Sequence, residues 1–407
     1  MRNRAENKLV LSDWNTISKL LPLLLFAIFD SMFTSFAPIL ARIAESFPNV
    51  STTMIQMILT MPSLTLVPTT LFAGVIATYI HKKTIAQFAL VIMGIGGIIP
   101  LIIHSSINAL FISSAIIGVG QGLLMPLSSS IICEYFSGRE RGTVMGFRQA
   151  ADYIGAAALT ILAGYLGLFA WYNVYWIYIL VIPVLIITSI FLPKGNLEVK
   201  LVGKGIGLKG IKNILTPSFI YMCFICFFVS GLFFAFYTNI SMMIVEKGIG
   251  DSADAAKVSS LNFILSLIVA LSFGFILRLF KKYTLAMGFL ILSLAFFILS
   301  FATSLSVTII GGMVFGLGTG YQQICSIFYI SESVPKTSAT IAISAALAVI
   351  GLGVSFSPII INTVKQAVIG VDTATASLLV AGVGYLIVFI VELIRETVFN
   401  KNSNIGI

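Results

Sequence analysis

Charged residues are scarce in this sequence. Asp, Glu, Lys and Arg make up 10% of its 407 residues, 58% of the residues are hydrophobic, and the mean hydropathy is +1.06. A soluble globular domain carries about 25% charged residues. Hydrophobic stretches of membrane-spanning length follow one another from residue 20 to about residue 394, which leaves no room for a separate soluble domain. The composition excludes an ordinary soluble protein and predicts an integral membrane protein.

Cysteine and histidine are also rare, with four and two residues. All four cysteines fall within apolar stretches, and the pair Cys223-x-x-Cys226 has neither a histidine nor a second pair nearby, which favours core packing over a metal or redox site. His81 and His104 lie at opposite ends of one predicted helix, so they cannot share a metal. No catalytic constellation is visible. We therefore expect no metal, no cofactor and no enzymatic activity.

The apolar stretches predict twelve transmembrane helices in an all-α fold. The N-terminal segment 1–19 lacks a cleavable signal, so the first span is expected to remain in the protein. The longest interior gap divides the chain into a six-helix bundle over 1–192, a basic linker over 193–216 and a second bundle over 217–407. The predicted spans are 20–41, 53–79, 84–103, 109–132, 143–168, 171–192, 217–244, 257–279, 284–303, 306–331, 338–362 and 373–394.

Basic residues give the orientation and argue against nucleic acid as a partner, because they sit in short loops between spans. Of the 24 Lys and Arg residues, Arg148 lies in a span and nineteen lie on one side of the membrane. The remaining four are Arg42, Lys247, Lys257 and Lys365. Positive charge marks the cytoplasmic side, so both termini are predicted to be cytoplasmic.

The two halves share landmarks. Gly118-x-Gly120-x-Gly122 in the fourth span has a counterpart 198 residues later in Gly316-x-Gly318-x-Gly320. Gly74, followed by Lys82 and Lys83 after the second span, has a counterpart in Gly274, followed by Lys281 and Lys282 after the eighth. The repeat predicts a duplicated six-helix unit. In membrane proteins built from such a duplication, a substrate site lies near the midplane of the membrane, between halves that rock against each other.

These features resemble the major facilitator superfamily over nearly the whole chain. The segment from Gly74 to Lys83 is similar to the signature loop of that family, with Thr78 and Tyr79 in place of its Asp-Arg pair. Further similarity lies in residues 44–48, 61–64 and 140–142. The resemblance implies secondary transport by a monomer, and it implies that the two loops with glycine and lysine pairs switch during the transport cycle.

Two departures from family patterns narrow the function. Gln121-Gly122 resembles the Gln-Gly pair of the fourth span in proton-coupled members, but Gly118 stands where those members carry an arginine. The glycine-rich segment 155–164 of the fifth span lacks the Gly-Pro of the drug antiporters. This second departure disfavours drug export.

Three ionisable residues lie well inside the spans, namely Asp30 in the first helix and Arg148 and Asp152 in the fifth. Charge at this depth is costly and is typical of a functional site. Arg148 and Asp152 are four residues apart and can pair, and the family arrangement places the first and fifth helices side by side. Two carboxylates sharing one arginine would leave one acid able to take up a proton. The alternative is a structural ion pair that locks the two helices.

The second half offers aromatic and amide groups in place of charge. Candidate cavity residues, together with Gln121, are Tyr237, Asn239, Tyr321, Gln322 and Gln323. Such a cavity suits an amphiphilic organic solute, with an organic anion as a candidate for Arg148. Core packing of the aromatic residues and hydrogen bonds between helices are the alternatives.

The sequence thus predicts a secondary transporter of a small organic solute in the cytoplasmic membrane of a bacterium, with protons as the expected coupling ion. One alternative is a multidrug efflux antiporter, favoured by the aromatic seventh helix. Another is a receptor or sensor with the same fold that moves no solute.

Overall fold

The computed structural model describes residues 14–136, 138–194, 216–280, 283–332 and 339–399, with only the backbone at 14–17, 138–139, 273–280, 323–332, 339–344 and 398–399. The described residues are helical and contain no β-strand. Ten of the described helical segments are long and apolar enough to cross a membrane. With α11 (Thr284–Ser300) and α12 (Leu305–Glu332), they make up the twelve predicted spans, each within a few residues of its predicted position.

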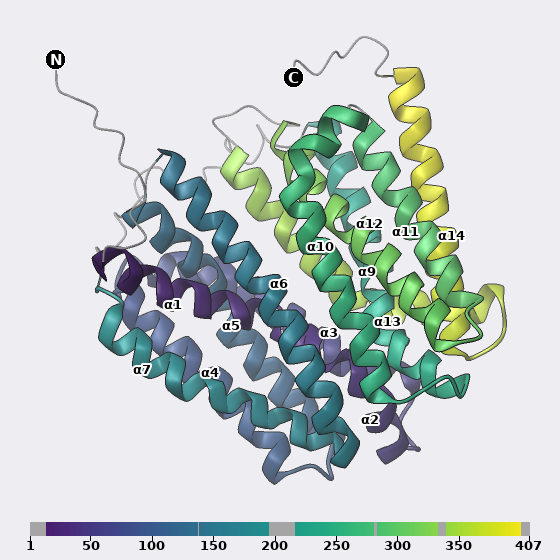
Figure 1. Cartoon of the computed structure of the whole chain (residues 1–407), viewed down its shortest axis with the longest axis horizontal. Coiled ribbons are helices and arrows are strands. Elements are labelled where there is room, and N and C mark those ends of the chain that lie inside the picture. The colour runs from purple at the N-terminus through teal and green to yellow at the C-terminus, as the bar shows by residue number, and fades with distance from the viewer. Residues whose placement is uncertain (1–13, 137, 195–215, 281–282, 333–338, 400–407) are drawn as a thin grey trace. The chain divides into compact units, whose positions relative to one another are not determined.

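The described chain forms two compact units (Figure 1). The first unit contains residues 14–33, 64–156 and 175–194, and the second contains residues 34–63, 157–174 and 216–399. The predicted boundary between the halves at 193–216 lies almost entirely outside the described residues, so the predicted division stays a prediction.

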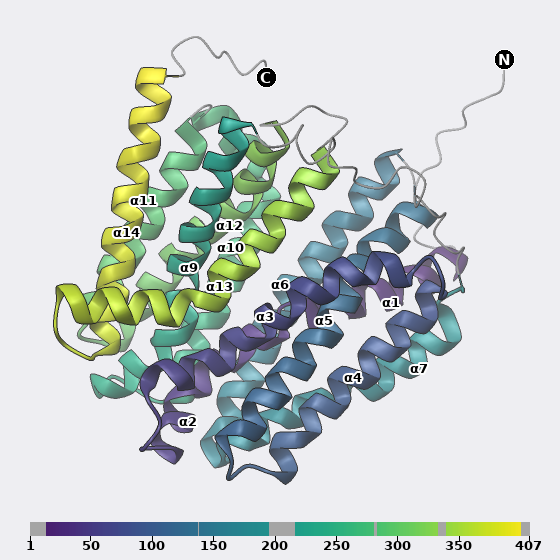
Figure 2. The same cartoon turned by 180° about the vertical axis from the view of Figure 1, so that it is seen from behind.

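In the first unit, α4 packs against α5 and α7, and α1 packs against the same two helices. Helices α4 and α7 lie side by side in both views (Figures 1 and 2). The helices of this unit are α1 (Trp14–Asp30), α4 (Lys82–Ile102), α5 (Ile107–Tyr135), α7 (Val181–Phe191), most of α6 (Gly138–Phe169) and the second half of α3 (Thr52–Ile76).

In the second unit, α9 packs against α13 and α14, while α12 packs against α10 and α11. Aromatic rings fill the interior, with Phe236 stacked on Phe315 at a centroid distance of 4.1 Å and Phe296 stacked on Tyr385 at 5.7 Å. The remaining helices of this unit are α2 (Leu40–Ser46), α9 (Pro217–Glu246), α10 (Ser252–Phe280), α13 (Ala339–Val368), α14 (Ala374–Ile394) and the π-helical turn η6 (Arg395–Phe399).

The first span is not the continuous helix that its composition predicts. Helix α1 ends at Asp30, a 3-10 helix follows over η1 (Met32–Ile39), and α-helix resumes in α2. Pro38 explains part of the change, because it has no N–H to offer the carbonyl four residues earlier and its ring crowds that carbonyl. A 3-10 stretch of this length is uncommon and is often found at functional hinges. The break places the end of a helix beside the ionisable residue of this span.

The glycines of the fourth span allow α5 to approach two neighbours closely. A Cβ added at Gly120 would overlap Met93 of α4, and one added at Gly122 would lie 2.7 Å from the carbonyl oxygen of Leu66 in α3. Small residues at such positions let membrane helices pack backbone to backbone.

The matching glycines of α12 do the same in the second unit. A Cβ at Gly318 would lie 2.5 Å from Leu292 of α11, and one at Gly320 would lie 2.6 Å from Val269 of α10. The repeat is therefore present in the packing as well as in the sequence. In both units the second glycine faces the helix directly before it in the chain, α4 or α11, and the third glycine faces the helix before that, α3 or α10.

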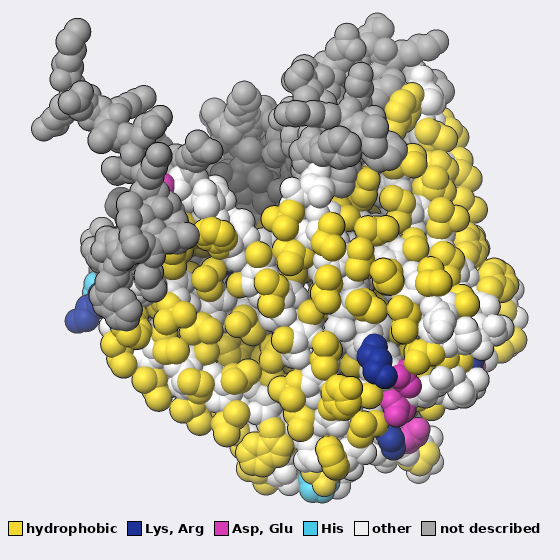
Figure 3. Space-filling model, in the orientation of Figure 1, with side chains coloured by type: hydrophobic (Ala, Val, Ile, Leu, Met, Phe, Trp, Pro, Cys, Tyr) yellow, Lys and Arg dark blue, Asp and Glu magenta, His cyan; other side chains and the backbone are white. Residues whose placement is uncertain are grey.

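The surface is apolar, as expected for contact with lipid. Hydrophobic side chains cover most of the described surface seen in Figure 3, and the charged side chains there gather in small groups. Large residues such as Phe72, Leu271 and Phe301 are 63–76% exposed. Exposure on this scale is the normal condition of a membrane-spanning surface.

We expect valine at Gly122 or Gly320 to destabilise the folded protein by about 1–3 kcal/mol, because the added methyl groups meet backbone or branched side chains that cannot move aside. The measurement is the thermal unfolding midpoint in detergent. Gly142→Val serves as the control, since a Cβ at Gly142 meets nothing within 4 Å. Equal midpoints for all three variants would contradict this account of the packing.

Candidate functional site

A buried ion pair joins the first and fifth spans within the first unit. The guanidinium of Arg148 in α6 donates through Nη2 to Oδ2 of Asp30 at the end of α1. The Asp30 side chain is 9% exposed and that of Arg148 is 14% exposed. Arg148 also donates through Nε to the hydroxyl of Ser128 in α5, at 2.9 Å. Three helices thus meet at one guanidinium.

Asp152 lies one turn after Arg148 on α6, but its hydrogen bonds go elsewhere. Its Oδ2 accepts from Nε2 of Gln149 at 3.1 Å, and Ser31 lies beside the same carboxyl group. Its Oδ1 is buried with no hydrogen-bond partner among the described residues. The pairing of Arg148 with Asp152, which their spacing allows, is therefore not the ion pair that the structure forms. Arg148 reaches across to Asp30.

Gln121 of α5 is hydrogen-bonded to the end of α1, just before the break in the first span. Its side chain is 2% exposed, and its Nε2 donates to the carbonyl oxygen of Phe29 at 2.9 Å. That carbonyl belongs to the last turn of α1, where carbonyl groups lose their partners within the helix. The same helix end carries a partial negative charge, which adds to that of Asp30 and increases its need for a counter-ion.

The cluster of Asp30, Gln121, Arg148 and Asp152 therefore holds two carboxyl groups against one guanidinium. An arginine keeps its charge at any working pH, whereas a carboxyl group can be neutralised by a proton. A buried carboxylate without a counter-ion is costly, and protonation relieves the cost. The arrangement can bind and release a proton, and the guanidinium can bind an anion.

The candidate cavity residues of the second half lie in separate surroundings within the second unit. Tyr237 is 2% exposed, packs among Phe233, Phe236 and Phe315, and accepts a hydrogen bond from Nδ2 of Asn262 at 2.8 Å. These contacts match the alternative of core packing.

The other four candidates of that set differ from Tyr237 in their surroundings. Tyr321 is 7% exposed and packs against Val269, and Gln322 accepts a hydrogen bond from the Tyr385 hydroxyl at 2.8 Å. The side chain of Gln323 lies outside the described residues. Asn239 is 1% exposed and belongs to a hydrogen-bond network between helices α3, α9 and α13.

The lysines of the first switch loop are fixed within the first unit. Lys82 is buried at the start of α4 and forms an ion pair with Glu134 of α5 at 3.1 Å, and Lys83 donates to the carbonyl of Ser189 in α7 at 2.6 Å. Gly74 lies near the end of α3, with open space around it. Of the second switch loop, Gly274 lies within helix α10, and Lys281 and Lys282 lie outside the described residues.

Sequence reasoning missed Ser31, Ser128 and Gln149 as members of the polar cluster. Ser128 could have been found, because it follows Gln121 by seven residues and so shares its face of α5. Gln149 is three residues from Asp152 on the same helix. Nothing in the sequence marks Ser31 except its place directly after Asp30.

Comparisons with known proteins agree with this fold. A family model described as Major Facilitator Superfamily matches residues 22–358. Among solved structures, a mutant of the nucleoside transporter NupG has a TM-score of 0.78 at 11% identity, over 92% of this chain and 98% of that one. A mutant of the peptide transporter POT has a TM-score of 0.72 at 15% identity, over 93% and 94%.

A third solved structure, the POT family transporter PepTSo, has a TM-score of 0.72 at 13% identity, over 94% of this chain and 99% of that one. No curated protein matches the chain. Similarity at this level of identity establishes the fold, which is all-α with twelve transmembrane helices in two six-helix bundles. The family match covers most of the chain, and the chain belongs to the Major Facilitator Superfamily as a multi-pass membrane transporter.

Proposed function

We propose that this transporter carries a small organic anion together with a proton across the cytoplasmic membrane of a bacterium, as a monomer with both termini in the cytoplasm. The observation that carries the proposal is the buried ion pair of Arg148 with Asp30, next to a second acid, Asp152, whose Oδ1 is buried without a hydrogen-bond partner among the described residues. A purely structural ion pair needs one acid, and here a second buried acid lies one turn away.

The coupling follows from competition for Arg148. A solute carboxylate or similar acid group that binds the guanidinium displaces Asp30 from it. Asp30 then has no cation beside it in a site of low dielectric, and it is neutralised by taking up a proton. Solute and proton therefore bind together, and each strengthens the binding of the other by the same factor.

Release reverses these steps. When the proton leaves, the Asp30 carboxylate competes again for Arg148 and expels the anion. We propose that the bundles predicted at 1–192 and 217–407 rock about this site, so that the steps occur on opposite sides of the membrane. The 3-10 stretch after Asp30 is suited to transmit the change of charge, since it is the weakest part of the first span.

The solved relatives fit a polar organic solute. They include a nucleoside transporter and peptide transporters, and one of the latter was solved with 5-aminolevulinic acid, which carries a carboxyl group. A first panel of solutes for this chain is therefore small carboxylic acids, dipeptides and nucleosides. We place the acids first because Arg148 is the cation of the described cluster.

Asp30→Asn is expected to abolish proton-driven accumulation of solute. An amide at position 30 can neither compete with the solute for Arg148 as a carboxylate does nor take up a proton. The measurement is uptake into proteoliposomes with an imposed pH gradient, using the panel member that wild type accumulates best. Exchange of labelled for unlabelled solute, which needs no net proton movement, should persist.

Glu45→Gln is the control for this experiment, since Glu45 is an exposed acid, 52% accessible, in the only described ion pair of α2. It should accumulate solute like wild type. Full accumulation by Asp30→Asn would show that Asp30 is not the coupling acid.

Arg148→Gln is expected to lower stability more than Asp30→Asn/Arg148→Gln does. The single change leaves Asp30 buried without its cation, a situation that costs about 3–5 kcal/mol in buried pairs. The double change removes both charges. Thermal midpoints in detergent over a pH series test this, and the deficit of Arg148→Gln should shrink at acid pH, where Asp30 can take up a proton. Equal midpoints for the single and double variants would show that the two side chains do not depend on each other.

A further inference from the structure

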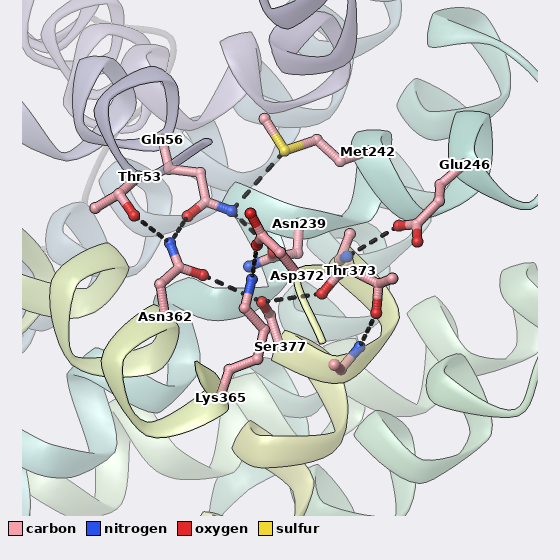
Figure 4. A network of polar contacts seen from close by, with 12 residues as sticks. Thr53, Gln56, Asn239, Met242, Glu246, Asn362, Lys365, Asp372, Thr373 and Ser377 are labelled. Atoms are coloured by element: carbon pink, nitrogen blue, oxygen red, sulfur yellow. Dashed lines mark hydrogen bonds and ion pairs between the residues drawn. The ribbon is translucent and has the colours of Figure 1, made fainter. Parts of the chain in front are cut away.

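Three uncharged amides tie together helices from the two predicted halves, all within the second unit. Nε2 of Gln56 in α3 donates to Oδ1 of Asn239 in α9 at 2.8 Å, and Oε1 of Gln56 accepts from Nδ2 of Asn362 in α13 at 2.7 Å. Figure 4 shows Gln56 between the other two. We name Gln56, Asn239 and Asn362 the amide latch. Gln56 and Asn239 are each 1% exposed.

Side chains next to the latch complete its hydrogen bonding. Nδ2 of Asn362 also donates to Oγ1 of Thr53 at 2.9 Å, and its Oδ1 accepts from the hydroxyl of Ser377 at 3.4 Å. Asn239 donates to the carbonyl of Ala235 at 2.9 Å. The latch is thus satisfied as it stands, without a bound ligand.

Further hydrogen bonds also join residues of the first predicted half to residues of the second, and we call this line of contacts the seam. The Ser241 hydroxyl donates to the carbonyl of Pro38 at 2.5 Å, and the Thr60 hydroxyl donates to the carbonyl of Ser355 at 3.3 Å. The ion pairs of the described residues all lie within one predicted half or the other, and none crosses this seam. The seam is held by neutral groups.

The latch lies close to one end of the helices that it joins. Gln56 is four residues from the start of α3, which is about 6 Å along the helix, and Asn239 and Asn362 lie about 9–11 Å from the ends of α9 and α13. Beyond the latch, the N–H of Ala374 donates to Glu246 at 2.9 Å, which joins the start of α14 to the end of α9. In the proposed orientation this is the outer end.

Neutral amides suit a contact that must break and reform in each cycle. When an ion pair separates, it leaves charges that need new counter-ions. A separated amide needs only water, which an opening outer end supplies. Hydrogen bonds between membrane helices are individually weak, so the latch biases the closed state without locking it.

We propose that the amide latch is the outer gate of the transporter, closed in this structure, and that it must separate before solute can pass the outer end. The proposal rests on alternating access in the proposed function. It predicts that removing a latch amide increases the time for which the outer side is open.

The test places a reporter cysteine below the latch. Ser63 lies two turns after Gln56 on the same face of α3 and is 6% exposed. Ser63→Cys is made in a protein whose four native cysteines are replaced by alanine. A membrane-impermeant maleimide is then applied to the outer side of whole cells, without solute, and the rate of labelling is measured.

Gln56→Ala and Asn362→Ala are each expected to raise the labelling rate on the order of tenfold. Gln56→Ala removes the hydrogen bonds of Gln56 to α9 and to Asn362, and Asn362→Ala removes those of Asn362 to Gln56 and Thr53. The matched control is Gln366→Ala, an exposed glutamine one turn after Asn362 on the same helix, which should label like the parent. All variants are compared as folded protein, recognised by one symmetric peak in size-exclusion chromatography.

Unchanged labelling in both folded latch variants would overturn the proposal, as would an equal rise in Gln366→Ala. The assay needs no solute and no proton gradient. A failure of the proposed transport would therefore appear as absent flux with the labelling rise intact, and a failure of the gate would appear as intact flux with no labelling rise.

Discussion

The ion pair between Arg148 and Asp30 is the interaction on which the proposed transport site depends. It places a permanent positive charge inside the membrane, where an unpaired charge is too costly to persist. Three polar side chains accompany this ion pair. Ser128 accepts from the guanidinium, Gln121 holds the helix end that carries Asp30, and Asp152 supplies a second acid.

The first span changes from α-helix to 3-10 helix directly beside this ion pair. A continuous helix would satisfy its own backbone and leave Phe29 without need of Gln121. In the structure, α1 ends at Asp30, and a 3-10 segment with Pro38 follows. The proposed site is therefore built on a helix end whose backbone is hydrogen-bonded to another helix.

Much of the fold follows from the sequence, because lipid allows few alternatives. Hydrophobic length predicted all twelve spans, and the glycine repeat marked the positions where α5 and α12 approach their neighbours. The break in the first span was not predicted, since its residues are as apolar as those of a continuous helix. Pro38 was visible, but a proline alone does not tell a kink from a change of helix type.

The site was predictable in part. The sequence predicted one polar cluster of Asp30, Arg148 and Asp152, in which either acid could pair with the arginine, and the structure pairs Arg148 with Asp30. Which acid lies opposite an arginine depends on how the helices rotate about their axes, and one sequence does not record this. For Asn239 the sequence left open a cavity position or a hydrogen bond between helices, and its bond with Gln56 depends on helices far apart in the chain.

Proton uptake on solute binding is the most direct measure of the coupling that we propose. Purified protein in weakly buffered detergent solution, with a pH dye, would be mixed with a small carboxylic acid that it transports, at a pH where that acid is fully ionised. The account predicts that the solution becomes more alkaline by about one proton per anion bound. Binding without any change in pH would contradict it, because Asp30 would then keep its charge after losing Arg148.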